Sequence, residues 1–261
     1  MFLQNLSNTD TDIFEGMTSI SAVINSINAG TSNRCIHTIY YDSAKADKKS
    51  RELSYLKIMA DRLGFELIPT DSASLEDISS GTTHGGFVAI SSKRDLPVLT
   101  ADVVSDSPCA FYALLEGIED PYNFGYSVRS LYASGADGII LPPRNWLEFS
   151  STVARSSAGC SELANIFVSE PVDAVNTFKE KGFNIICAGI RDSVSVYEAD
   201  FSKPTLLIVG GEKRGISRKL LDMCNQTVRI DYGCEFKGSL PTASAVSVIA
   251  FEALHQRKCS K

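Results

Sequence analysis

Three short turns in this sequence combine polar side chains with glycine or proline, and each lies next to an apolar segment. The first turn, residues 119–129, carries Asn123 and Arg129. The second, residues 210–212, reads Gly-Gly-Glu, and the third, residues 239–242, reads Ser-Leu-Pro-Thr. Ligands of open α/β sheets bind beyond the carboxyl ends of the strands. The positions of the three turns therefore predict that they converge on one ligand.

The Gly-Gly pair at 210 and 211 presents no Cβ, so a flat group such as adenine or ribose can approach the backbone closely. No Gly-x-Gly-x-x-Gly opens a helix, and residues 210–214 lack the Gly-Lys-Ser/Thr ending of a phosphate loop, which excludes a standard Rossmann or P-loop site. Taken alone, the second turn is equally consistent with a strand-to-helix turn that exposes Glu212. Residues 120–123 alone also fit an ordinary helix N-cap.

Strands and helices alternate on both sides of an irregular, proline-containing segment, residues 91–108. We place a domain boundary near residue 103, which gives domains 1–103 and 104–261. In the first domain the apolar spacing predicts two helices and three strands, over residues 16–28 and 45–63, and over residues 35–41, 65–69 and 85–90.

In the second domain the same patterns predict an α/β fold, with a mostly parallel sheet covered by helices on both faces. The long polar loop 189–204 either shapes a site or rims one. The expected strands are 111–115, 138–141, 166–168, 184–188, 206–210 and 228–230, and the expected helices are 125–134, 146–157, 172–181, 218–224 and 242–258.

Composition narrows the class of protein. Seven scattered cysteines with no Cys-x-x-Cys spacing indicate reduced thiols, not a disulfide framework, and make a zinc site improbable. The polar N-terminus and the lack of a long apolar run predict a cytoplasmic protein with no membrane segment. With a net charge of −6, nucleic-acid binding would depend on local basic clusters. One such cluster, which could equally be a solvated helix face, comprises Lys213, Arg214, Arg218 and Lys219.

The three turns lie within longer segments that resemble the three ordered motifs of a known family. These segments are GIEDPYNFGYSVRSLYASGADGIIL, LLIVGGEKRGIS and VRIDYGCEFKGSLPTASAVSVIAFEAL. They are similar to the SpoU (TrmH-type) RNA 2′-O-ribose methyltransferases of the SPOUT superfamily, and the resemblance covers Phe111 to the C-terminus. Upstream, residues 82–89 resemble the end of the small RNA-recognition domain that many members carry.

The resemblance implies a small α/β RNA-recognition domain followed by a SPOUT-type parallel sheet with a deep trefoil knot, which binds S-adenosylmethionine and forms a homodimer. The RNA partner would be tRNA or rRNA, and the resemblance does not say which nucleotide is the target. By the same resemblance Gly210, Ile230 and Leu240 hold the cofactor, with Val209, Gly211 and Ala188 nearby. The motif positions around the methyl-acceptor ribose are Asn123, Arg129, Glu212 and Ser239.

Arg129 is the base proposed for the family, yet a guanidinium resists deprotonation. We therefore expect Arg129 to hold the phosphate beside the target ribose, and Glu212 to orient its neighbours through hydrogen bonds.

Two positions depart from the family pattern. Pro241 replaces the usual Asn and removes a hydrogen-bond donor. Asp231-Tyr232 replaces the usual Pro-Met pair. These departures leave open a knotted RNA-binding module without catalysis, and the fold itself leaves open methylation of a base.

Overall fold

The computed structural model describes residues 11–79, 84–143 and 150–259. The chain divides into two compact units. The first contains residues 1–95 and 145–163, and the second contains residues 96–144 and 164–261. This division differs from the expected boundary near residue 103. The described residues 150–163 come after that boundary in sequence but group with the first unit. Each unit has its own sheet and its own apolar core.

The first unit is a four-stranded sheet with the order β1-β4-β2-β3, in which only β2 and β3 are parallel. Helices cover both faces: α1 and α2 pack on one core cluster, and α3 packs on a smaller cluster. Three elements, β1, α3 and α6, were not expected from the sequence. The strands are β1 (Thr11–Glu15), β2 (Ile36–Asp42), β3 (Glu66–Thr70) and β4 (Phe87–Ser92), and the helices are α1 (Gly16–Asn28), α2 (Ser50–Leu63) and α3 (Ser72–Ile78), with α5 (Ser150–Ser156) and α6 (Cys160–Leu163) from the second segment.

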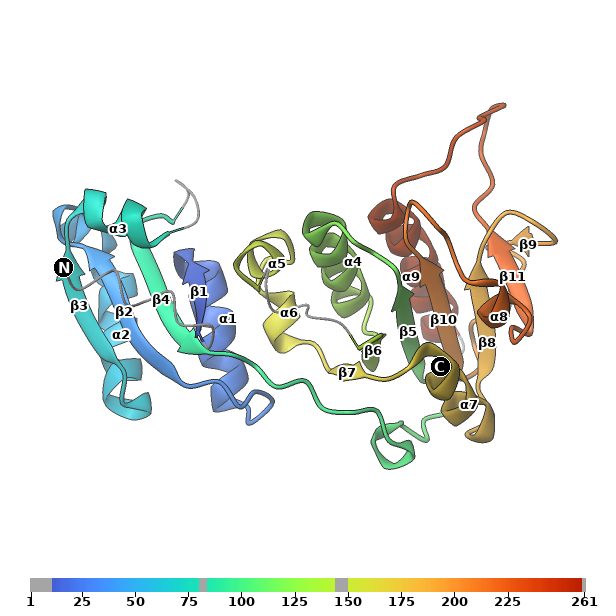
Figure 1. Ribbon diagram of the computed structural model, residues 1–261, viewed down its shortest axis with the longest axis horizontal. Coiled ribbons are helices and arrows are strands. Elements are labelled where there is room, and N and C mark those ends of the chain that lie inside the picture. The colour runs from blue at the N-terminus through green and yellow to red at the C-terminus, as the bar shows by residue number, and fades with distance from the viewer. Residues whose placement is uncertain (1–10, 80–83, 144–149, 260–261) are drawn as a thin grey trace. The chain divides into compact units, whose positions relative to one another are not determined.

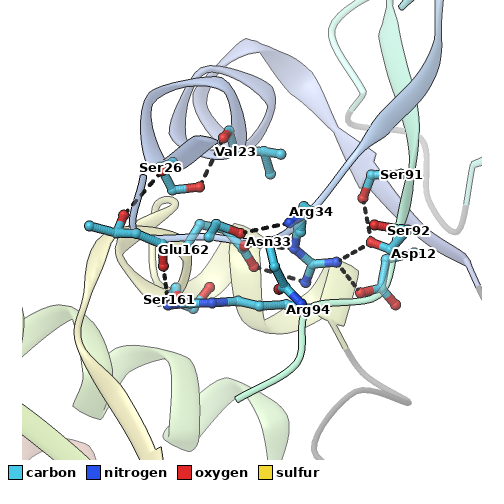
Figure 2. Close-up of polar contacts among 12 residues, drawn as sticks. Asp12, Val23, Ser26, Asn33, Arg34, Ser91, Ser92, Arg94, Ser161 and Glu162 are labelled. Carbon is cyan, nitrogen blue, oxygen red and sulfur yellow. Dashed lines mark hydrogen bonds and ion pairs between the residues drawn. The ribbon is translucent and has the colours of Figure 1, made fainter. Parts of the chain in front are cut away.

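A buried cluster of charges holds α6 against the rest of the first unit (Figure 2). Arg34 donates to Glu162 from Nε at 2.8 Å and from Nη2 at 3.2 Å, and to Asp12 from Nη1 at 2.6 Å. Arg94 donates to the carbonyl oxygen of Ser161 at 2.7 Å. All four charged side chains are buried. Buried charges need such partners, because an unpaired charge away from water is costly.

The second unit is a seven-stranded sheet with the order β7-β6-β5-β10-β8-β11-β9, and each paired neighbour is parallel (Figure 1). This confirms the predicted α/β class with a parallel sheet. Its strands are β5 (Phe111–Glu116), β6 (Gly138–Leu141), β7 (Ile166–Val168), β8 (Asn184–Ala188), β9 (Val194–Ser195), β10 (Thr205–Gly210) and β11 (Gln226–Arg229). Its helices are α4 (Pro121–Ala133), α7 (Pro171–Glu180), α8 (Arg218–Leu221) and α9 (Thr242–Cys259).

Both faces of this sheet are covered, as expected for parallel strands that are apolar throughout. On one face Tyr112 of β5 packs against Phe178 of α7, with ring centroids 4.9 Å apart. On the other face the guanidinium of Arg257 in α9 lies 4.7 Å from the ring centroid of Phe111. Helices α4 and α9 also contact each other, and the hydroxyls of Ser130 and Ser247 are 2.7 Å apart.

The sequence predicted seven reduced cysteines, and this prediction is wrong for two of them. Cys187 in β8 and Cys224 after α8 form a disulfide, with Cα atoms 6.2 Å apart. Residue 224 leads into β11, which pairs with β8, so the fold brings together two cysteines that are 37 residues apart in sequence. The remaining five cysteines are free.

No helix among the described residues is long and apolar enough to cross a membrane. Part of the motif-like segment 82–89, namely Thr82 and Thr83, lies outside the described residues, as does the start of the helix expected over 146–157.

Candidate active site

One cavity in the second unit lies where the carboxyl ends of β8, β10 and β11 meet the start of α9. Its volume is about 190 Å³. Ligands of open parallel sheets are expected at this edge, beyond the carboxyl ends of the strands. Its walls come from four separate parts of the sequence, and comprise Ala188, Gly189, Ile190, Val209, Gly210, Gly211, Glu212, Val228, Arg229, Ile230, Tyr232, Ser239, Leu240, Thr242, Ala245 and Ile249.

The structure brings eight of the ten candidate residues to this cavity. They are the six proposed cofactor contacts, Ala188, Val209, Gly210, Gly211, Ile230 and Leu240, together with Glu212 and Ser239. Asn123 and Arg129 do not line it. Several wall residues were not singled out as contacts, including Ile190, Arg229, Thr242 and Ile249. Ile190, Arg229 and Ile249 lie outside the three turns, so the sequence carried little signal for them. Thr242 ends the third turn, but the family resemblance assigned it no contact.

The two glycines after β10 are required by close backbone packing. A Cβ at Gly211 would lie 1.9 Å from the carbonyl oxygen of Gly117, and one at Gly210 would lie 2.2 Å from the carbonyl carbon of Gly215. Both distances are far below van der Waals contact. The missing side chains therefore let residue 211 pack against residue 117, just before the first turn, and let residue 210 pack against residue 215, while both glycines also line the cavity.

Hydrogen bonds fix the first turn relative to the second. The carbonyl oxygen of Glu116 accepts from the N–H of Gly211 at 2.8 Å, and its carboxylate accepts from the N–H of Ser217 at 2.9 Å. Further along, Lys213 pairs with Glu119 at 2.8 Å. The motif residues thus form one connected structure around the end of β10.

Asn123 lies in the first turn of α4. The side chain of Asp120 caps this helix by accepting from the N–H of Asn123 at 2.8 Å, and Pro121 occupies the first helical turn. This is the ordinary N-cap that the sequence allowed as an alternative. The cap does not exclude a functional role, because it engages the backbone of Asn123 and leaves its partly exposed amide side chain available.

Arg129 lies on the exposed surface of α4, two turns after the cap. On the same helix, Tyr122, Tyr126 and Tyr132 are also exposed. The basic cluster near the second turn is exposed as well, and within it Lys213 and Arg218 pair with acidic neighbours. Elsewhere in the chain, Arg155 pairs with Glu15 in the first unit, and Arg144 lies outside the described residues.

The third turn closes the cavity from the side of α9. Pro241 supplies the carbonyl oxygen that accepts from the N–H groups of Ser244 and Ala245, so it begins the helix without needing a donor. The hydroxyl of Thr242 donates to the carbonyl oxygen of Gly210 at 3.4 Å, a long bond. Proline is therefore compatible with the local fold at this position.

The departure at Asp231-Tyr232 forms new contacts. Asp231 accepts from Nε of Arg229 at 2.9 Å. A hydrogen bond from Ser195, followed by the charge of Arg229, lowers the pKa of the Asp231 carboxyl. Arg229 also donates to the carbonyl oxygen of Ser193, which ties the end of β11 to the long loop after β8.

A parallel α/β sheet with a cavity at its strand ends, walled in part by the second and third motif turns, is typical of proteins that bind nucleotide-type ligands. Within that class, a family model described as the SpoU rRNA Methylase family matches residues 110–251. The chain belongs to this family.

The similarity to individual proteins covers more of the chain than residues 110–251. The chain is 28% identical over 227 residues to the "23S rRNA (guanosine-2'-O-)-methyltransferase RlmB" of Ralstonia nicotianae, covering 86% of this chain and 89% of that one. It is 27% identical to a "Putative TrmH family tRNA/rRNA methyltransferase" of Staphylococcus saprophyticus, covering 68% and 73%. An AdoMet-bound rRNA methyltransferase structure from Sinorhizobium meliloti aligns with a TM-score of 0.76 at 22% identity, over 94% of this chain and 87% of that one.

Proposed function

We propose that this protein is an S-adenosylmethionine-dependent RNA methyltransferase that transfers a methyl group to a ribose 2′-hydroxyl of ribosomal RNA. The observation that carries the proposal is the cavity at the strand ends, which is walled in part by residues of the second and third motif turns. Membership of the SpoU family supports the same activity. The names of the relatives, several of which specify 23S rRNA and guanosine, favour ribosomal RNA over tRNA.

The cavity suits the cofactor. A nucleoside-type ligand needs apolar walls for its flat base and exposed backbone groups for its polar edge. Val228, Leu240 and Ile249 supply apolar surface, and residues 188–190 and 210–211 supply backbone groups. We assign cofactor binding to Ala188, Val209, Gly210, Gly211, Ile230 and Leu240. When bound, the cofactor supplies a methyl group already activated by a positive sulfonium.

The remaining task of the protein is to position the ribose oxygen in line with that methyl group and to help remove its proton. Positioning alone can supply effective molarities of roughly 10⁵–10⁸ M. Glu212 and Ser239 line the cavity, and we assign them to orient the 2′-hydroxyl. Asn123 is assigned to the same acceptor site, and Arg129 is assigned to the phosphate beside the target ribose, where a permanently charged guanidinium is well suited.

We also propose the homodimer, the trefoil knot and the role of the first unit in RNA recognition. The exposed side chains Tyr122, Tyr126 and Tyr132 of α4 and Phe251 of α9 support a dimer surface, because two contacting helices here present aromatic groups to solvent. Sedimentation velocity tests it: wild type should sediment as a dimer and Tyr126→Glu as a monomer. The knot rests on family membership.

The activity is tested by incubating the full-length protein with methyl-labelled S-adenosylmethionine and total ribosomal RNA, followed by mass spectrometry of nucleosides. The expected product is one 2′-O-methylated nucleoside in an alkali-resistant linkage. A modified base would establish base methylation instead. Binding of RNA without measurable cofactor affinity in calorimetry would establish the non-catalytic module that Pro241 left open, and either result refutes the proposal.

A further inference from the structure

The loop between β11 and α9 forms a second hollow beside the cofactor cavity. Its volume is about 490 Å³. It shares Ile190, Arg229, Ile230 and Tyr232 with the first cavity. The residues found only in the second hollow are Asp231, Cys234, Glu235, Phe236, Lys237 and Gly238. We propose that this hollow binds an unpaired nucleobase of the RNA substrate, stacked on Phe236; the substrate class rests on the proposed function.

Two aromatic rings form the wall of the hollow. The rings of Tyr232 and Phe236 meet edge to face, with centroids 5.2 Å apart and an interplanar angle of 79°. Phe236 remains 50% exposed, and Ile190 across the hollow is 68% exposed. Single exposed apolar side chains are common on protein surfaces. A group of them beside a ligand cavity instead indicates a binding surface.

The exposed ring of Phe236 is held in place before any ligand arrives. Tyr232 supports it from one side, and the hydroxyl of Tyr232 accepts a hydrogen bond from the N–H of Leu240 at 3.2 Å, which closes the loop. Gly238 lies so close that a Cβ there would be 2.6 Å from the Phe236 ring. A ring that is already held in place loses little conformational entropy when it binds a partner. The fixed position of Phe236 therefore favours ligand binding.

The charges around the hollow favour a base over a phosphate. The two cations that line it, Arg229 and Lys237, are balanced by the two carboxylates Asp231 and Glu235. Arg229 is already engaged by Asp231. Stacking of a neutral planar base on an aromatic ring does not need a net positive charge, and it requires a base that is free of its own helix.

The position of the hollow explains why a base would bind there. Tyr232 lines both cavities, so a base stacked on the Tyr232–Phe236 pair lies next to the cofactor site. A nucleotide anchored in this way restricts where a ribose can lie relative to the methyl group. Tyr232 belongs to the pair of residues that departs from the family pattern, so its contact with Phe236 depends on a side chain that the usual Met would not supply.

The first test compares two glycine variants of the full-length protein. Gly238→Ala places a Cβ against the Phe236 ring, whereas Gly233→Ala, the matched control, places a Cβ where no atom lies within 4 Å. Gly238→Ala and Phe236→Ala should each raise the KM for RNA by about 5- to 100-fold, the range that stacking of one base supplies. Their KM for S-adenosylmethionine should stay within about twofold of wild type, and Gly233→Ala should behave as wild type.

Two results overturn the proposal. If Phe236→Ala raises the KM for S-adenosylmethionine and not for RNA, the aromatic pair covers the cofactor. If neither KM changes, the hollow binds nothing that matters for the reaction. Phe236→Tyr keeps a stacking ring and should restore the wild-type KM for RNA, which separates stacking from a folding defect.

A binding measurement separates failure of this proposal from failure of the proposed function. Trp146 is the only tryptophan in the sequence, so Phe236→Trp in a Trp146→Phe background gives one fluorescent reporter in the hollow. A single-stranded RNA oligonucleotide of mixed sequence should quench the introduced indole, and a fully paired duplex of the same sequence should not. If neither RNA quenches the fluorescence, or both quench it equally, the proposed base site is wrong. If the single strand alone quenches it but the protein transfers no methyl group, the base site is supported and the proposed activity is refuted.

Discussion

The carboxylate of Glu116 accepts a 2.9 Å hydrogen bond from the backbone N–H of Ser217, 101 residues later in the sequence. The bond joins the end of β5 to the start of α8. The carbonyl oxygen of the same residue accepts from Gly211. Glu116 thus connects the end of β5 to two points of the second motif segment, and one of its partners, Gly211, lines the cavity.

Loss of the Glu116 side chain should weaken cofactor binding without removing any cofactor contact. A hydrogen bond to a charged group contributes about 1.5–3 kcal/mol, and partial exposure reduces this to about 1 kcal/mol. Glu116→Ala should therefore raise the dissociation constant for S-adenosylmethionine about fivefold in calorimetry. Glu119→Ala is the matched control, since its ion pair with Lys213 is exposed. An equal effect of both variants would contradict the linking role of Glu116.

Much of this site was predictable from the sequence, because its residues follow strands directly. Once Leu206–Gly210 is placed as a buried parallel strand, the next residues must lie at the carboxyl edge of the sheet. The strands 138–141, 166–168 and 184–188 have the bounds expected from their short apolar runs. Local spacing determines such elements well.

Other features depend on contacts between distant residues, and local spacing carries no signal for them. The pairing of Arg34 with Glu162 spans 128 positions and joins α6 to the rest of the first unit. The disulfide between Cys187 and Cys224 likewise depends on the pairing of β8 with β11. Strand β1 was missed because five residues with a mixed pattern do not stand out from a polar N-terminus.

Arg129 provides a test of the role assignment. It is exposed on α4 and does not line the cavity. Arg129→Ala should therefore leave the affinity for S-adenosylmethionine within about twofold and lower kcat/KM for RNA by at least about 100-fold, which corresponds to one charge-assisted phosphate contact of about 3 kcal/mol. Calorimetry and single-turnover methyl transfer measure the two quantities separately.

The substitution Arg129→Lys distinguishes the possible roles of this residue. A lysine retains the charge but lacks the planar fork of donors. Substantial activity in Arg129→Lys would indicate a simple charge contact with phosphate. Loss of cofactor binding in Arg129→Ala would instead place the side chain in the cofactor site and refute the assignment.

The buried charge cluster predicts how the segment 150–163 is held in the first unit. Removing Arg34 leaves Asp12 and Glu162 as buried carboxylates without their main cation, and breaking such a pair costs about 3–5 kcal/mol. Arg34→Met should therefore increase amide hydrogen exchange throughout α5 and α6. The control is Lys49→Met, which removes a partly exposed ion pair with Glu52 worth less than about 1 kcal/mol. Unchanged exchange in Arg34→Met would show that apolar packing alone holds the segment.

The last prediction concerns acid stability and the carboxylate of Asp42 at the end of β2. It accepts from the hydroxyl of Ser72 at 2.7 Å and from the N–H of Ala44 at 3.1 Å, and it pairs with Lys45 at 3.0 Å. These contacts, led by the Ser72 hydrogen bond, lower the pKa of the Asp42 carboxyl. Its folded pKa then lies below the unfolded value of about 3.9.

A carboxyl with a lowered folded pKa stabilises the protein above the unfolded pKa, and this contribution disappears as the pH falls through the folded pKa. The difference in free energy of unfolding between wild type and Asp42→Asn should therefore be constant from about pH 7 to pH 5 and shrink below about pH 4. Ser72→Ala removes the largest cause of the lowered pKa. The free energy of unfolding of this variant should therefore fall less with acidification than that of wild type. The free energy of unfolding of the first unit is measured at each pH by urea unfolding, with hydrogen exchange as the probe. A difference between wild type and Asp42→Asn that stays constant down to pH 3 would mean that Asp42 keeps its ordinary pKa in the folded protein.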